Sequence, residues 1–150
     1  MTEWYDLGWH DASAALEARL TANLLRFDQI AELHAVHRLG ARFPDMSSRV
    51  PTPGHDVLFE GRRVEVKAKE PSAKPRSRLY VEPQPGKRKG SDLFWFYMFG
   101  ESEAALEVWE VDTPSVFANL SLRRGKAITL ARIERIGRPI WRDGRDCRKG

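Results

Sequence analysis

The chain has 150 residues, of which 41% are hydrophobic and 31% are charged, and its formal net charge is +4. This length and composition are those of one globular domain, residues 1–150, and they exclude an intrinsically disordered chain. The single cysteine, Cys147, excludes a disulfide framework and a cysteine-based zinc cluster, and it favours a reducing, cytoplasmic location. Nowhere do eighteen apolar residues run together, and residues 1–10 contain no apolar core segment, so we expect neither a membrane span nor secretion.

Positive charge is concentrated after residue 50. Residues 1–50 carry five Lys or Arg against seven Asp or Glu, whereas residues 51–150 carry twenty against fourteen. A basic excess of this kind suits a polyanionic partner such as nucleic acid, although it also serves solubility.

The N-terminal part predicts a helix over about residues 12–39. Neither Gly nor Pro occurs in 12–38, and apolar residues recur at steps of three and four, which indicates one long helix or two abutting helices. Asp11 or Ser13 is the expected N-cap, and Gly40 is the expected end. A short strand is expected around residues 41–50.

Residues 55–69 predict a β-hairpin that carries charged groups on one face. In 64–69 apolar and charged residues alternate, so the charged ones share a face. They are Glu65, Lys67 and Lys69. Glu60-Gly61 suits a two-residue turn, which would place Asp56 across from Glu65. Two facing carboxylates repel each other, so a divalent cation with Lys67 beside it would satisfy this arrangement.

Residues 70–90 predict two basic loops around a short strand at Leu79–Glu82. Four prolines forbid a long regular element there. Loops at the edge of a scaffold often hold substrate, and basic ones suit a phosphate backbone. With Lys69, the candidate nucleic-acid-binding residues are Lys74, Arg76, Arg78, Lys87, Arg88 and Lys89. An ordinary solvated loop is the alternative interpretation.

The second half predicts alternating strands and a short helix. Residues 93–99 are apolar on both faces, as in a buried central strand, and residues 106–111 form a second strand. Thr113 is expected to cap a helix with Pro114 at its first position, running to about Leu120. Residues 127–133 predict a last strand, and the tail over 143–150 is expected to be frayed.

The hairpin resembles the PD-(D/E)XK nuclease superfamily, in which an Asp opens one strand and Glu-x-Lys follows on the next after a tight hairpin. The matching residues are Asp56 and Glu65-Val66-Lys67, while His55 stands where the family has Pro. Over about residues 27–133 the pattern is similar to small intron-associated homing endonucleases and Holliday-junction resolvases. The resemblance implies an α/β, restriction-endonuclease-like fold: a central mixed β-sheet flanked by helices, with an αβββαβ core.

The same resemblance implies a Mg²⁺-dependent (or Mn²⁺-dependent) DNA endonuclease that hydrolyses phosphodiester bonds. Asp56, Glu65 and the main-chain carbonyl of Val66 would hold the metal, and Lys67 would orient the attacking water and stabilise the transition state. Glu32 matches the acid that several of these families bring from the first helix, where it could bind a second metal or a metal-bound water.

Several alternatives stay open at this point. Glu17 is the fallback for the helix acid, and Glu32 is as readily a solvated helix charge. DNA cannot be distinguished from RNA, and a homodimer is favoured only because one site must cut two strands. His34 and His37 lie three apart on the helix, but they are interpreted as non-ligands because no third ligand is near in sequence. His55, next to Asp56, could assist the metal site or donate a hydrogen bond to phosphate, and it is as readily a loop histidine without a role.

Two other functions compete with the nuclease. The first is a nuclease-like domain that binds nucleic acid or a protein without cutting, although the complete set of Asp56, Glu65 and Lys67 argues against it. The second is a small β-rich binding protein in which Glu65 and Lys67 belong to an exposed strand face. Burial of that face distinguishes the second from the nuclease.

Overall fold

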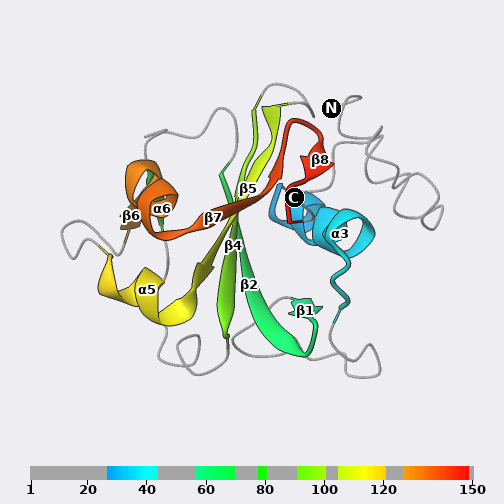
Figure 1. Cartoon of the computed structure of the whole chain (residues 1–150), viewed down its shortest axis with the longest axis horizontal. Helices are drawn as coiled ribbons and strands as arrows, with labels where there is room; N and C mark the ends of the chain where they lie inside the picture. The colour runs from blue at the N-terminus through cyan, green and yellow to red at the C-terminus, as the bar shows by residue number, and fades with distance from the viewer. Residues whose placement is uncertain are drawn as a thin grey trace.

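The computed structural model describes residues 27–43, 57–69, 78–80, 91–100, 105–120 and 127–148. Figure 1 shows their helices and strands. In chain order they are α3 (Phe27–Leu39), β1 (Val57–Phe59), β2 (Arg62–Lys69), β3 (Arg78–Tyr80), β4 (Leu93–Met98), β5 (Glu107–Asp112), α5 (Thr113–Ala118), β6 (Ala127–Thr129), α6 (Leu130–Ile136), β7 (Arg138–Arg142) and β8 (Arg145–Asp146). In this part of the chain, no helix combines the length and the apolar character needed to cross a membrane.

The central feature is a curled, mixed sheet of six strands in the order β1-β2-β4-β5-β7-β8. Strands β2 and β4 are parallel, and the other neighbours are antiparallel. All residues of β4 except Met98 are buried, which confirms the predicted central strand. The fold is therefore mixed α/β. A separate two-stranded sheet pairs β3 with β6, and β3 overlaps the short strand expected at Leu79–Glu82.

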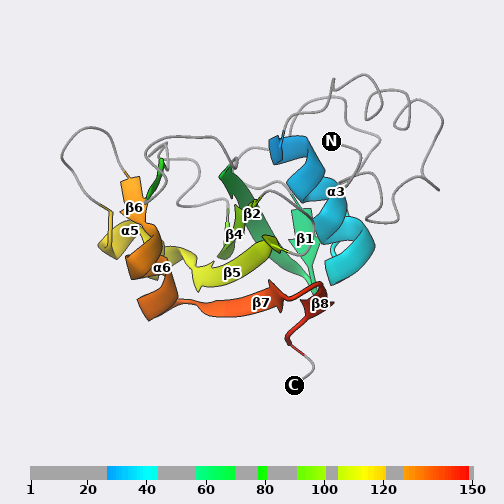
Figure 2. The ribbon, with the colours of Figure 1, turned by 90° about the horizontal axis from the view of Figure 1, so that it is seen from above.

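The two faces of the six-stranded sheet are covered by different helices (Figure 2). On one face, here called the α3 face, α3 packs in a cluster that includes Val64, Val66 and Trp95. On the opposite face, here called the α6 face, Phe94 and Phe96 pack with residues of α5, β6 and α6. Because neighbouring strand residues point to opposite faces, both clusters draw on β4.

The predicted hairpin is confirmed between residues 57 and 69. Glu60 and Gly61 have φ values of 49° and 77°, and positive φ at both central residues is what a two-residue type I′ turn requires. Val57 pairs with Val64 and Phe59 with Arg62. Arg42 forms a bridge with Leu58, so an extended residue occurs where a strand over 41–50 was expected, although residues 44–50 lie outside the described residues.

The expected helix end is also confirmed. Helix α3 stops at Leu39, and Gly40 has φ 79°, a left-handed conformation common after helix C-termini. The earlier part of the expected helix, residues 12–26, with Asp11 and Ser13, lies outside the described residues.

Two element boundaries differ from the prediction. Asp112, and not Thr113, caps α5, because its carboxylate accepts a hydrogen bond from the Ser115 backbone N–H at 3.1 Å. The Thr113 hydroxyl instead lies 3.2 Å from that of Ser91. The strand expected over 127–133 stops at Thr129, whose side chain caps α6.

The expectation of a frayed tail over 143–150 is wrong for residues 143–148. Asp143 and Gly144 have φ values of 56° and 73° and form the turn between β7 and β8. Beyond β8, the Arg148 guanidinium donates to the Leu39 carbonyl at 2.8 Å and lies over the Phe59 ring at 4.7 Å. Arg148 therefore connects the β8 edge of the curled sheet with α3 and the β1 edge.

Candidate active site

Strand β2 places Glu65 and Lys67 side by side on the α6 face. Their neighbours Val64 and Val66 belong to the α3-face cluster, so the two charged residues point the other way. In register with them on β4 are Phe94 and Phe96. Glu65 is only 3% exposed, in the middle of an apolar sheet face.

The Lys67 ammonium lies 3.5 Å from a carboxylate oxygen of Glu65. The side chain of Lys67 is 18% exposed, so the pair lies largely out of water. Transferring two charges from water costs several kcal/mol for each ion, and an apolar pair of similar size would often be at least as stable. A buried acid–lysine pair is therefore a candidate functional site. Its burial contradicts the alternative in which these residues belong to an exposed strand face.

Val66, the residue between them, directs its peptide groups towards the β1 side of β2. On the β4 side, the carbonyls of Arg63 and Lys69 accept hydrogen bonds from the backbone N–H groups of Asp92 and Phe99. Successive residues of a strand direct these groups to alternate sides, and Val64 pairs with Val57 on the β1 side. The Val66 carbonyl oxygen is thus directed to the side on which the first arm of the hairpin lies.

Asp56, the expected partner of Glu65, lies outside the described residues, as do His55 and Glu17. The described part of the β1–β2 pairing begins at Val57, which follows Asp56 and lies opposite Val64. Lys69 is partly exposed at the end of β2, and Arg78 is described as a backbone position in β3. The other predicted nucleic-acid-binding residues lie outside the described residues: Lys74, Arg76, Lys87, Arg88 and Lys89.

The structure does not bring Glu32 to Glu65. Glu32 is a partly exposed residue of α3, and α3 packs on the opposite face of the sheet from Glu65. Glu32 lies on that face because α3 packs on the sheet through its apolar side, which includes Ile30, Ala31 and Ala35. This apolar side was visible in the sequence, but the face that it would cover was not.

The two helix histidines do not form a ligand pair. His34 is fully buried, with Nδ1 2.9 Å from the Tyr97 hydroxyl and the ring edge-on to Trp141 at 4.5 Å. Burial, followed by the nearby charge of Arg38, lowers the pKa of His34 to about 3. His37 is exposed. His34 is therefore a core residue, whereas His37 belongs to the exposed side of the helix.

Among the residues that the structure describes, no group of three or more His, Cys, Asp or Glu side chains could hold a metal ion. The donors that the described residues would offer are a Glu65 carboxylate oxygen and the Val66 carbonyl oxygen. Such hard oxygen donors fit Mg²⁺ or Mn²⁺ better than zinc.

A second buried carboxylate, Glu110, was not identified from the sequence. It lies on β5 on the α3 face, 8% exposed, and accepts hydrogen bonds from Trp95 Nε1 at 2.9 Å and from Arg138 Nε at 3.0 Å. The available signal was a Glu flanked directly by the apolar residues Trp109 and Val111.

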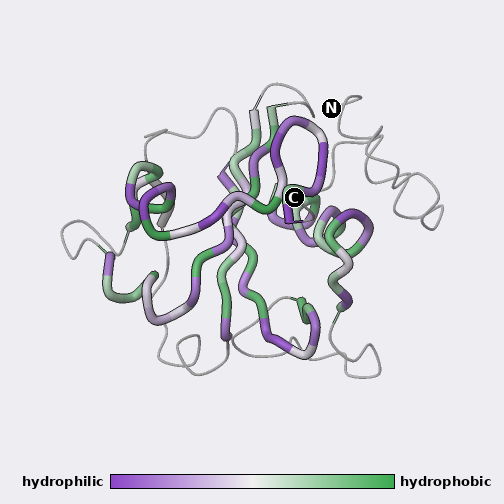
Figure 3. Tube along the Cα trace, in the orientation of Figure 1, coloured by the Kyte–Doolittle hydropathy of each residue, from purple (hydrophilic) through white to green (hydrophobic). Residues whose placement is uncertain are grey.

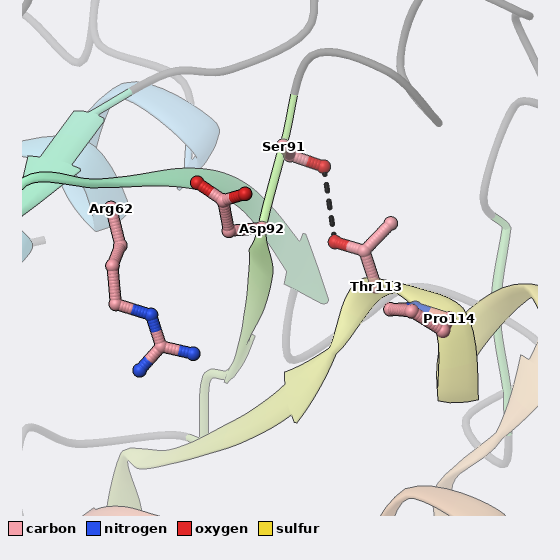
Figure 4. A pocket seen from close by; sticks show the side chains of 5 residues that line it. All are labelled: Arg62, Ser91, Asp92, Thr113 and Pro114. Atoms are coloured by element: carbon pink, nitrogen blue, oxygen red, sulfur yellow. Dashed lines mark hydrogen bonds between the residues drawn. The ribbon is translucent and has the colours of Figure 1, made fainter.

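An open hollow of about 640 Å³ lies where β2 and β4 begin and β5 ends. Figure 4 shows its lining: Arg62, Ser91, Asp92, Thr113 and Pro114. Beside it, Asp92 accepts hydrogen bonds from the backbone and guanidinium of Arg63, and these bonds hold the pKa of Asp92 below its usual value. Since both side chains are about 40% exposed, the pair adds little stability, but it aligns the starts of the two parallel strands.

No protein-family model matches the chain, and no curated protein matches it. The candidate site is therefore defined by its own residues and geometry.

Proposed function

We propose that this protein is a metal-dependent DNA endonuclease of the PD-(D/E)XK type that uses the β1–β2 hairpin as its active site. The observation that carries the proposal is the buried Glu65 with Lys67 3.5 Å away, on one sheet face and directly after a tight hairpin. The proposal includes the finer fold assignment, a restriction-endonuclease-like αβββαβ core. Helices on both faces of a mixed sheet support that assignment.

In this proposal, Asp56, Glu65 and the Val66 carbonyl oxygen hold one Mg²⁺ or Mn²⁺. A bound cation would supply Lewis-acid activation of the phosphate and of the attacking water. The described residues support two of the three ligands, because β2 places the Glu65 carboxylate on the α6 face and directs the Val66 carbonyl towards the first arm of the hairpin. Glu32 is left out of the site because α3 lies on the other face.

In this proposal, the Lys67 ammonium group provides a positive charge beside the scissile phosphate. An ammonium group on a flexible stem can orient a water molecule and stabilise the negative charge that grows on the phosphate in the transition state. The Glu65 carboxylate lies 3.5 Å away, so the two opposite charges form an ion pair on the α6 face. Because one such site cuts one strand, cleavage of a duplex would favour a homodimer.

The test is cleavage of supercoiled plasmid and of a synthetic four-way junction, with Mg²⁺, with Mn²⁺ and with EDTA. We expect metal-dependent nicking by the wild type. Lys67→Ala should lower the rate by roughly 10²–10³-fold, as when one charge-stabilising donor is removed. Asp56→Asn should abolish cleavage because it removes a metal ligand, and both variants should still bind DNA.

The matched control is Glu134→Gln, which changes one charge at an exposed position on α6. It should cleave like the wild type. Full activity of Lys67→Ala would show that the residues are wrongly assigned. DNA binding by the wild type without cleavage of either substrate would favour the rival function, a nuclease-like binding domain.

A further inference from the structure

A row of five residues, four of them charged, crosses the α6 face at the end of β2. The strand registers align Lys69 with Met98 and Met98 with Glu107, and Arg142 with Arg145. An ion pair of 3.7 Å between Glu107 and Arg142 joins the first three of these residues, on β2, β4 and β5, to the last two, on β7 and β8. We call these five positions, on β2, β4, β5, β7 and β8, the charged row: Lys69, Met98, Glu107, Arg142 and Arg145.

The charged row is the accessible end of this face. The adjacent row, which starts at Lys67, continues through Phe96 and Trp109, and both aromatic residues are buried. Four members of the charged row are partly exposed, and Arg145 is exposed. Helix α6 and strand β8 lie at opposite ends of β7 (Figure 1), so α6 leaves the row uncovered. Figure 3 shows that the β7–β8 turn is largely hydrophilic.

Arg142 is held in place before any partner arrives. Its guanidinium lies over the Trp109 ring at 5.2 Å and pairs with Glu107, whose carboxylate also accepts a hydrogen bond from Trp109 Nε1 at 2.9 Å. The side chain of Arg142 is still 42% exposed. A guanidinium fixed on one side and exposed on the other suits bidentate contact with a phosphate.

Arg145 adds a second, like charge directly across from Arg142. The two residues flank the Asp143–Gly144 turn as a cross-strand pair and therefore share a face. Like charges in this position are unfavourable in the absence of an anion. An approaching polyanion would relieve the repulsion, so this observation points to a partner independently of the Arg142 geometry.

We propose that the charged row binds the phosphate backbone of duplex DNA and leads it to Glu65 and Lys67. From Lys69 to Arg145 the row covers four strand spacings, about 19 Å. That exceeds the width of the B-DNA major groove, about 12 Å, so the ends of the row can contact both strands that border it. The inference rests on the proposed function and narrows its substrate to a duplex.

The test is the salt dependence of duplex binding, measured in EDTA so that no DNA is cut. Each lost phosphate contact reduces the slope of log K against log salt by about 0.9. The double variant Arg142→Gln/Arg145→Gln should therefore lose about 1.8 from the slope. The charge-conserving variant Arg142→Lys/Arg145→Lys should keep the slope, even though the Trp109 contact changes.

The matched control is Arg132→Gln/Arg135→Gln, with the same charge change at two exposed positions on α6. Its slope should stay at the wild-type value. An equal loss in both double variants would reveal a long-range charge effect and overturn the inference. An unchanged slope in Arg142→Gln/Arg145→Gln would also overturn the inference. The same holds if poly-glutamate binds to the protein and displaces the duplex. These outcomes leave the plasmid cleavage test intact, so failure of the row and failure of the nuclease are distinguishable.

Discussion

The two faces of the sheet carry buried polar groups in different settings. On the α3 face, His34 contacts the Tyr97 hydroxyl and Glu110 accepts from Trp95, each at 2.9 Å and with the aromatic partner fully buried. On the α6 face, Glu65 lies beside Lys67, and further along β2 the face reaches the exposed cations of the charged row. The polar groups on the α3 face are bonded to buried aromatic residues and stabilise the fold. Those on the α6 face continue along β2 to exposed residues, where a substrate can reach the protein.

The strongest test of this difference compares one acid from each side of the sheet. Glu65→Gln should reduce DNA cleavage by at least about 10³-fold, because in the proposed site it would remove a metal ligand and the carboxylate that pairs with Lys67. Glu32→Gln, on the α3 side, should stay within about threefold of wild type, since a partly exposed charge away from the reacting groups contributes little. Plasmid nicking rates check both. Equal losses would mean that α3 reaches the site and that the faces are not functionally distinct.

A second test uses pH to disturb the enclosed face. The pKa of His34 is about 3 in the folded protein against 6.5 for the unfolded chain, so its contribution to stability is complete above pH 6.5. Below pH 6.5 the unfolded state binds a proton that the folded state does not. Between pH 6.5 and 5 the free energy of unfolding should fall by about 2 kcal/mol.

Urea denaturation at several pH values measures this fall. His34→Leu removes the titrating group, so its stability should change by less than half as much over the same interval. Carboxylates are mostly ionised in this range and add little to the slope. A variant with the same pH dependence as the wild type would show that His34 is not the group responsible.

A third test concerns the second buried acid, Glu110, and is expected to leave cleavage unchanged. Glu110→Ala removes the acceptor of the buried Trp95 N–H, and an unsatisfied buried donor costs about 1–3 kcal/mol. Loss of the Arg138 pair should add little because that side chain is 62% exposed. Thermal unfolding measures the change, and cleavage should persist at temperatures where the variant is folded. Loss of cleavage in the folded variant would give the α3 face a catalytic role.

Local sequence patterns predicted those features that depend on neighbouring residues. The alternation in 64–69 placed Glu65 and Lys67 on one face, and Glu60-Gly61 gave the hairpin turn. The unbroken apolar run of β4 predicted its burial. Each of these signals is complete within a few residues, which is why it could be interpreted without knowledge of the fold.

Features that depend on distant contacts could not be predicted in the same way. One local feature was also missed: Asp143-Gly144 forms a turn like Glu60-Gly61, but only its first arm carries apolar residues, Ile140 and Trp141, and the second arm, Arg145–Asp146, is charged. The apolar spacing predicted that α3 has a buried side, but not which face of the sheet that side would cover. That choice separated Glu32 from Glu65.

The Arg148 contact has a consequence for how the chain folds. Its guanidinium reaches the Leu39 carbonyl across 109 residues of sequence, whereas the β1–β2 hairpin closes within a few residues. Contacts between distant residues must first overcome loop-closure entropy, so they form late and slow folding. We expect the hairpin with Glu65 to form early, and the seam between α3 and the β8 edge to close only after the six strands have paired. Refolding kinetics of this protein should therefore show a late step that is sensitive to Arg148 and insensitive to Glu65.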